Sequence, residues 1–253
     1  AAAYKHVPLI ENNPFSALKN NFIDTYSFMN LVIDAKISYF CLISSDKAVR
    51  PTNIMGSTKR LSEIALLYLS NLNNHQTTFS TVRFGNVINS SGSVKPLFQK
   101  QIDNNGPLTI THKDIIRYFM TIEEAANLVL NTYNISKGGE IFLLEMGEPV
   151  KLYDLAKLMI QFSGKNLKIN GSGDIEIKTI GLRRGEKLYE ELLVDKKTKQ
   201  SPIKSIYQSL EENVPNNDFK KILLEVNKSY KSYDYNSLIK IISNNYIKYK
   251  QDK

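Results

Sequence analysis

The sequence predicts an α/β fold built on a parallel sheet with crossover helices. Apolar runs at residues 39–43 and 78–84 have the length of buried strands, and each ends abruptly in polar residues. Helical spacing of apolar residues marks the segments 14–35 and 51–72 around these strands. Because two parallel strands must be joined by a crossover, alternating helices and buried strands indicate a parallel sheet.

The rest of the chain continues this pattern less regularly. Gly and Pro residues interrupt the segment 89–114, for which we expect irregular structure with one short strand at 108–110. Thr121 and Glu124 form a capping box before a helix expected at 125–133. The other expected elements are strands at 140–146 and 175–179, a turn and short helix at 182–193, and helices at 152–162, 218–228 and 235–250.

Composition excludes several classes of protein. With 42% hydrophobic and 23% charged residues in a chain of 253, the protein is an ordinary globular one without an apolar run of membrane-span length or a secretory signal. The single Cys41 can form no internal disulfide, which fits a reducing compartment such as the cytoplasm. The lysines behind the net charge of +8 are spread widely, so we expect no nucleic-acid partner. His6, His75 and His112 share no metal-ligand spacing, and we expect no metal.

A polar loop follows the first expected strand. It reads Ser44-Ser45-Asp46-Lys47 and lies at the carboxyl end of the strand, where open α/β sheets bind ligands. Lys59 falls one helical turn after Met55 on the next helix, so both side chains share a face. Taken alone, this stretch is an ordinary polar loop.

The loop and several later motifs together resemble one family closely. This is the CapD-like group of UDP-N-acetylglucosamine 4,6-dehydratases, which are extended short-chain dehydrogenase/reductases. The resemblance covers about residues 1–195, and its combination of motifs is specific. In chain order the motifs are AAAYKHVPLIE from residue 1, SSDKAV from 44, PTNIMGSTKR from 51, RFGNV from 83, RYFMTI from 117, MGEPV from 146 and GLRRGEKLYEEL from 181.

The resemblance implies an incomplete Rossmann-type, doubly wound parallel sheet with a smaller substrate-binding α/β region on its C-terminal side. Residues 1–88 would form the C-terminal part of the NAD-binding domain, to which about 115–148 would return. Residues 89–114 and 149–253 would bind the nucleotide sugar. The family begins with a Gly-rich turn that holds the NAD pyrophosphate, and this sequence contains no such turn, so the chain looks like one that lacks this first part.

The implied activity is an NAD-dependent conversion of UDP-N-acetylglucosamine into a UDP-4-keto-6-deoxy-N-acetylhexosamine for surface polysaccharide or glycan synthesis. In this family NAD+ takes a hydride from C4, water leaves across C5 and C6, and the hydride returns to C6. By resemblance, Asp46 protonates the leaving hydroxyl and Lys47 removes the C5 proton. Ser45 takes the place of the usual Thr that hydrogen-bonds the C4 oxygen.

The base at C4 is left open by the sequence. Lys59 resembles the lysine of the family's Tyr-x-x-x-Lys pair, which binds the nicotinamide ribose, but the tyrosine position holds Met55. A thioether cannot accept a proton, so either Asp46 or a water held by Lys59 would serve. Membrane-anchored members of the family are similar in carrying Met there.

The remaining site residues also follow from the resemblance. The cofactor-binding residues would be Ala2, Ala3, Asn21, Ser44 and Lys59. The substrate-binding residues would be Lys5, Arg83, Asn86, Arg117, Arg183 and Glu186, with Arg184 as an alternative to Arg183. We expect a UDP-sugar substrate, a homo-oligomer, and a place at the cytoplasmic face of the membrane if a preceding part anchors the protein.

Two other functions are considered. A nucleotide-sugar epimerase of the same superfamily is disfavoured by the Asp46–Lys47 pair, because epimerases need no elimination at C5. A catalytically inactive nucleotide-sugar-binding fragment is favoured by the missing Gly-rich turn and disfavoured by the intact Ser45, Asp46, Lys47 and Lys59.

Overall fold

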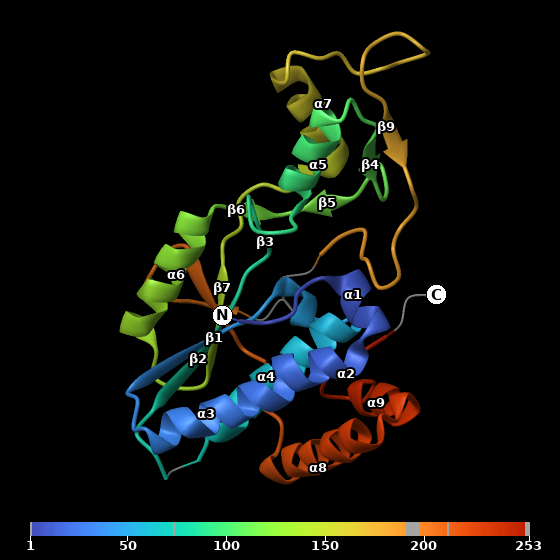
Figure 1. Ribbon diagram of the computed structural model, residues 1–253. Helices are drawn as coiled ribbons and strands as arrows, with labels where there is room; N and C mark the ends of the chain where they lie inside the picture. Colours follow the sequence, from blue (N-terminus) through green and yellow to red (C-terminus); the bar gives the residue numbers. More distant parts are fainter. Residues whose placement is uncertain (1, 73, 191–197, 212, 251–253) are drawn as a thin grey trace. The chain divides into compact units, whose positions relative to one another are not determined.

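The structure is a computed structural model that describes residues 2–72, 74–190, 198–211 and 213–250 (Figure 1). It contains two compact units. Unit 1 comprises Ala1–Phe84, Asn127–Glu145 and Glu191–Lys253, and unit 2 comprises Gly85–Ala126 and Met146–Glu190.

The sheet of unit 1 has the order β1-β2-β7-β11-β10. Its first three strands, β1(Tyr39–Ile43), β2(Thr78–Arg83) and β7(Glu140–Leu144), are parallel, as the alternation of strands and helices predicts. The last two, β11(Ile206–Ser209) and β10(Thr198–Gln200), join antiparallel to β7 and to each other. Only Leu42 of β1 is fully buried, because β1 is an edge strand of the sheet that the described residues form.

Helices supply the apolar core of unit 1. Long α4 is buried along nearly its whole length and packs with the N-terminal and C-terminal helices. Figure 1 shows α8 and α9 side by side, drawn in orange to red, with α8 next to α4. The helices are α1(Val7–Asn12), α2(Pro14–Ala17), the π-helical stretch η1(Leu18–Asp24), α3(Thr25–Asp34), the 3₁₀ turn η2(Asp46–Ala48), α4(Ile54–Ser70), α8(Asn216–Ser232) and α9(Tyr235–Ile242). The completely buried side chains at the centre of the unit 1 core include Phe22, Leu61, Phe79 and Phe219.

Unit 2 is built from short strand pairs and two helices. Its core contains Phe98 and Ile102 of α5 together with Ala156 and Ile160 of α7. Its elements are β3(Asn86–Val87), α5(Val94–Asp103), β4(Leu108–Ile110), β5(Ile116–Arg117), β6(Phe119–Met120), β8(Val150–Lys151), α7(Leu152–Phe162) and β9(Ile177–Thr179). The pairs β3–β6 and β4–β9 are parallel, and β5–β8 is antiparallel.

Helix α6(Ile122–Ile135) confirms the capping box. The Thr121 Oγ accepts from the Glu124 N–H at 3.1 Å, and Glu124 Oε2 accepts from the Thr121 N–H at 2.6 Å. Hydrogen bonds from the backbone and the side chain of Thr121 to the carboxyl group hold the pKa of Glu124 below its usual value.

Three local expectations are corrected. A helix, α5, lies in the segment 89–114, where we expected irregular structure. Pro96 does not break this helix, because it stands in the first turn, where a proline is tolerated. Helix α9 ends at Ile242, and Asn244 then caps a turn by accepting from the Tyr246 and Ile247 N–H groups. Residues 182–190 contain a turn and no helix; residues 191–193, also assigned to that helix, lie outside the described residues.

The grouping of the C-terminal residues also differs from the expected one. We expected 149–253 to form a single region with 89–114, but the described residues from 198 onward belong to unit 1. The reason is physical: β11 pairs with β7, and α8 packs on α4 with Phe219 in the shared core.

Candidate active site

The loop after β1 brings an acid, an amine and a hydroxyl into direct contact. Asp46 Oδ1 accepts hydrogen bonds from the Ser45 hydroxyl at 2.8 Å and from Lys47 Nζ at 3.0 Å. The Asp46 side chain is 3% exposed and that of Lys47 is 21% exposed. The loop therefore holds a buried carboxylate whose amine partner still reaches solvent.

Gly56 lets this loop lie directly against α4. A Cβ at Gly56 would stand 2.0 Å from the Lys47 carbonyl oxygen and 2.9 Å from its carbonyl carbon. Only a glycine allows this approach, and Asn53 supports the same turn by accepting from the Gly56 N–H at 2.8 Å. Sequence reasoning missed Gly56 as a positioning residue, although its place inside an otherwise helical pattern was a signal.

Met55 and Lys59 lie one turn apart on α4, as predicted, and both are buried. Lys59 Nζ donates to the Ile43 carbonyl oxygen at 2.5 Å. Burial lowers the pKa of Lys59 to about 8, against the opposing negative charge of Glu63. The amine is thus poised to exchange its proton near neutral pH, whereas the thioether of Met55 has none to exchange.

Asn21 fastens the first residues of the chain to α4. Its Nδ2 donates to the Tyr4 carbonyl oxygen at 2.9 Å and to Thr58 Oγ1 at 3.0 Å, and its Oδ1 accepts from the Tyr4 N–H at 2.8 Å. Asn21 lies in the π-helical stretch and is completely buried. Ala2 and Lys5 are exposed and Ala3 is half-buried, so the segment that Asn21 clamps to α4 is accessible to solvent.

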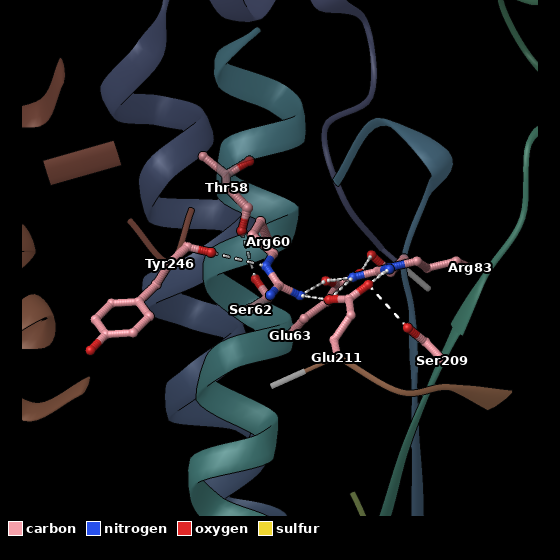
Figure 2. Close-up of polar contacts among 9 residues, drawn as sticks. Thr58, Arg60, Ser62, Glu63, Arg83, Ser209, Glu211 and Tyr246 are labelled. Atoms are coloured by element: carbon pink, nitrogen blue, oxygen red, sulfur yellow. Dashed lines mark hydrogen bonds and ion pairs between the residues drawn. The ribbon is translucent and has the colours of Figure 1, made fainter. Parts of the chain in front are cut away.

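A buried network of two arginines and two glutamates lies beside the loop (Figure 2). Glu63 and Arg60 come from α4, Arg83 from the end of β2, and Glu211 from the residues after β11. Arg83 Nε and Nη2 donate to the two Glu63 oxygens at 2.8 and 2.6 Å, and its Nη1 and Nη2 donate to Glu211. Arg60 Nη1 pairs with Glu63 at 3.0 Å and with Glu211 at 2.7 Å.

The network corrects the role expected for Arg83. Its side chain is 0% exposed and fully paired within the chain, so it does not offer its guanidinium to a substrate phosphate. Burial alone would lower the pKa of Arg83, but the Glu63 charge outweighs that effect and raises it. Ser44, expected near the cofactor, is 4% exposed and donates its hydroxyl to Glu63 Oε1 at 2.5 Å.

In unit 2 the candidate substrate residues gather around one carboxylate. Glu186 Oε1 accepts from Thr111 Oγ1 at 3.0 Å and from Arg117 Nη2 at 3.4 Å, and its Oε2 accepts from the Arg183 N–H at 3.1 Å. Arg117 also donates to the Ile116, Lys187 and Leu188 carbonyl oxygens, so it is a brace for the segment 183–190. The Arg183 side chain is exposed, which leaves it accessible to an anion.

Asn86 completes the expected set in unit 2. It is half-buried in β3, where its N–H donates to the Tyr118 carbonyl oxygen at 3.1 Å. Among the described residues no group of three His, Cys, Asp or Glu side chains could hold a metal ion. Among the same residues no helix has the length and apolar character of a membrane span.

Several known proteins are similar to this chain over about three quarters of its length. The chain is 51% identical over 193 residues to the capsular polysaccharide biosynthesis protein CapD of Staphylococcus aureus, with 76% of this chain and 31% of that protein covered. It is 33% identical to an inverting UDP-N-acetylglucosamine 4,6-dehydratase of Campylobacter jejuni (75% and 54% covered). It is 35% identical to a UDP-glucose 4-epimerase of Rickettsia rickettsii (76% and 54% covered). The chain thus spans about a third to about half of these relatives.

Solved structures share the fold. The X-ray structure of Pen from Bacillus thuringiensis superimposes with a TM-score of 0.75 at 32% identity, covering 90% of this chain and 74% of that one. The dTDP-glucose 4,6-dehydratase DesIV of Streptomyces venezuelae, solved with NAD bound, gives 0.69 at 14% identity, covering 94% and 74%, which supports the Rossmann-like α/β fold alone. A family model described as polysaccharide biosynthesis protein matches residues 1–211, and the chain therefore belongs to that family.

Proposed function

We propose that this chain carries the elimination site of an NAD-dependent nucleotide-sugar 4,6-dehydratase that acts on UDP-N-acetylglucosamine. The observation that carries the proposal is the contact between Asp46 and Lys47 at the carboxyl end of β1, 3.0 Å apart, with one partner buried and the other partly exposed. A dehydratase needs both an acid and a base there, whereas an epimerase needs neither at C5.

The ion pair can supply both functions without gaining or losing a proton. Moving one proton from Lys47 Nζ to Asp46 Oδ1 turns ammonium and carboxylate into amine and carboxylic acid. The amine then takes the C5 proton, the acid protonates the departing C6 hydroxyl as water, and the original ion pair is restored.

Ser45 and Lys59 have supporting functions in this proposal. The Ser45 hydroxyl, which bonds Asp46 Oδ1, would turn to donate to the C4 oxygen and stabilise the ketone that activates C5. A bound NAD would accept the C4 hydride and return it at C6. Lys59 fits the nicotinamide ribose because its ammonium has three donors and its bond to the Ile43 carbonyl oxygen uses one.

The nucleotide diphosphate would bind residues of unit 2. Arg183 is exposed and its backbone is fixed by Glu186, so its planar guanidinium could bind a phosphate with two hydrogen bonds. Arg117 would hold this segment in place, and Asn86 would offer its amide.

A second candidate is a UDP-hexose 4-epimerase, which the similarity to the Rickettsia enzyme favours. One assay separates the candidates. The full-length protein is incubated with NAD+ and UDP-N-acetylglucosamine, and the sugar is followed by proton NMR. A 6-methyl signal of a 4-keto-6-deoxy product supports the dehydratase. A C4 epimer supports the epimerase, and binding of the nucleotide sugar without turnover supports an inactive binding protein.

A further inference from the structure

Glu63 lies outside every motif that the resemblance assigns to chemistry, yet it contacts the residue that begins the candidate loop. Its side chain is completely buried in α4. Its Oε1 accepts from the Ser44 hydroxyl at 2.5 Å, and Ser44 directly precedes Ser45, Asp46 and Lys47. A carboxylate inside a protein is costly unless it is paired, so its partners indicate its purpose.

Two neighbouring turns of α4 hold the end of β1. Lys59 and Glu63 are four residues apart and share a face of the helix. Lys59 binds the Ile43 carbonyl oxygen and Glu63 binds the Ser44 hydroxyl, so two successive residues of the strand end are fixed from one helix. These two bonds fix the start of the loop, at Ser44, relative to α4.

Glu63 also ties this strand end to β2. The Arg83 side chain forms a two-pronged bond to both Glu63 oxygens at 2.8 and 2.6 Å. The backbones continue the same connection, because the Ser44 N–H donates to the Val82 carbonyl oxygen at 2.8 Å and the Asp46 N–H donates to the Phe84 carbonyl oxygen at 3.2 Å. The carboxyl ends of β1 and β2 thus meet at one carboxylate, that of Glu63.

We propose that Glu63 is the positioning residue of the Ser45–Lys47 loop, holding it at the depth where Asp46 is buried and Lys47 is partly exposed. The proposal deepens the proposed dehydratase function, and its catalytic consequence rests on that function. Its structural consequence, a loop fixed by one buried carboxylate, is independent of the reaction.

Glu211 provides a matched control. It is the second carboxylate of the same network and pairs with the same two arginines, Arg60 and Arg83. Its own hydroxyl partner is Ser209 at 3.1 Å, in β11, and not Ser44. Glu63→Met and Glu211→Met therefore remove the same charge from the same pair of guanidinium groups, and only the first removes the acceptor of Ser44.

Hydrogen–deuterium exchange of the chain without ligand tests the positioning directly. Exchange at the Ser44 and Asp46 amides is expected to speed up by about tenfold relative to the Phe79 amide in Glu63→Met, and to stay within about twofold of wild type in Glu211→Met. Ser44→Ala breaks the same contact while keeping all four charges, so it is expected to reproduce the effect even if Glu63→Met does not fold. Equal acceleration in Glu63→Met and Glu211→Met, or none in Ser44→Ala, overturns the proposal.

Turnover of the full-length protein tests the catalytic consequence. Because a misplacement of about 1 Å can cost about a hundredfold in rate, Glu63→Met is expected to lower kcat by that factor while KM changes by less than about threefold. Glu211→Met, assayed below its unfolding temperature, is expected to keep kcat. If wild type shows no dehydratase activity but the exchange result holds, the function proposed above fails and the positioning role stands. If wild type is active and Glu63→Met keeps kcat, the positioning role fails.

Discussion

The Lys59 ammonium group lies 2.5 Å from the Ile43 carbonyl oxygen, so the helix that carries the candidate site is bonded to the last residue of β1. The bond places a cation in a site where only 8% of the Lys59 residue is exposed. Burial destabilises this cation by more than the nearby Glu63 charge stabilises it, which gives the site a measurable pH dependence.

Lys59 is expected to titrate with a pKa of about 8 in the folded chain, against 10.5 for an ordinary lysine. Between these values the unfolded chain binds more protons at this group than the folded chain, so its contribution to the free energy of unfolding rises with pH, by about 3 kcal/mol in total. The measurement compares urea unfolding of wild type and Lys59→Met from pH 7 to 10.5, with nitrogen NMR of labelled lysine as a direct readout. A Lys59 resonance that titrates above pH 10 would contradict this expectation.

Gly56→Ala is expected to destabilise the chain even though alanine favours helices. In an ordinary helix interior the change adds up to about 1 kcal/mol of stability. Here the new Cβ meets the Lys47 carbonyl oxygen at 2.0 Å, so we expect a loss of about 1–3 kcal/mol in the free energy of unfolding. Thermal unfolding of the variant measures the sign, and a more stable Gly56→Ala protein would mean that the loop does not lie against α4.

Asn21→Ala is expected to release the N-terminal segment from α4. The substitution removes three side-chain hydrogen bonds, two of them to the backbone of Tyr4, at a cost of about 2 kcal/mol. Asn20→Ala is the matched control, since Asn20 Oδ1 accepts from the same Tyr4 N–H at a longer 3.3 Å. Exchange of the Tyr4 amide should accelerate much more in Asn21→Ala, and similar rates in both variants would refute the clamp.

Glu211 is expected to make the chain sensitive to acid. Burial would raise its pKa, but the hydrogen bond from Arg83 and the positive charges of Arg60 and Arg83 outweigh this and lower it to about 2, against 4.5 for an ordinary glutamate. The resulting stabilisation, about 3 kcal/mol, is fully present above pH 4.5 and is lost as the pH falls towards 2.

Unfolding of wild type and Glu211→Gln between pH 2 and 7 measures this contribution. The stability difference between them should shrink across the acid part of the range. Glu225→Gln, which changes an exposed carboxylate of α8, should stay close to wild type throughout. If the difference in the free energy of unfolding between wild type and Glu211→Gln stays constant with pH, Glu211 is not held in the charged form.

The sequence was informative where burial follows periodicity. The apolar run 39–43 and the helical spacing at 51–72 predicted β1 and α4, because an apolar run of strand length and a helical repeat of apolar residues both mark elements that pack in a core. Helix α5 was not predicted because Gly and Pro residues around it suggested a loop, although Phe98 and Ile102 are spaced four apart.

The burial of the charged side chains could not be predicted from such patterns. By resemblance Arg83 was expected to bind substrate, and its pairing with Glu211 joins residues 128 positions apart. Glu63 on a helix suggests a solvated residue, since charged side chains are seldom fully buried. The burial of Arg83 and of Glu63 depends on partners that are distant in sequence, and local residue spacing does not indicate such partners.

Incorporation of solvent deuterium at C5 tests the central claim most directly. The full-length protein, supplied with NAD+ and UDP-N-acetylglucosamine in D₂O, is compared with its Lys47→Met variant by NMR. If Lys47 and Asp46 carry out the elimination, wild type forms a 4-keto-6-deoxy sugar, and Lys47→Met forms it about 10²-fold or more slowly. The wild-type product carries deuterium at C5 and none at C6, because C6 receives the hydride that left C4. A 4-epimer without deuterium at C5, or a Lys47→Met variant as fast as wild type, would contradict the claim.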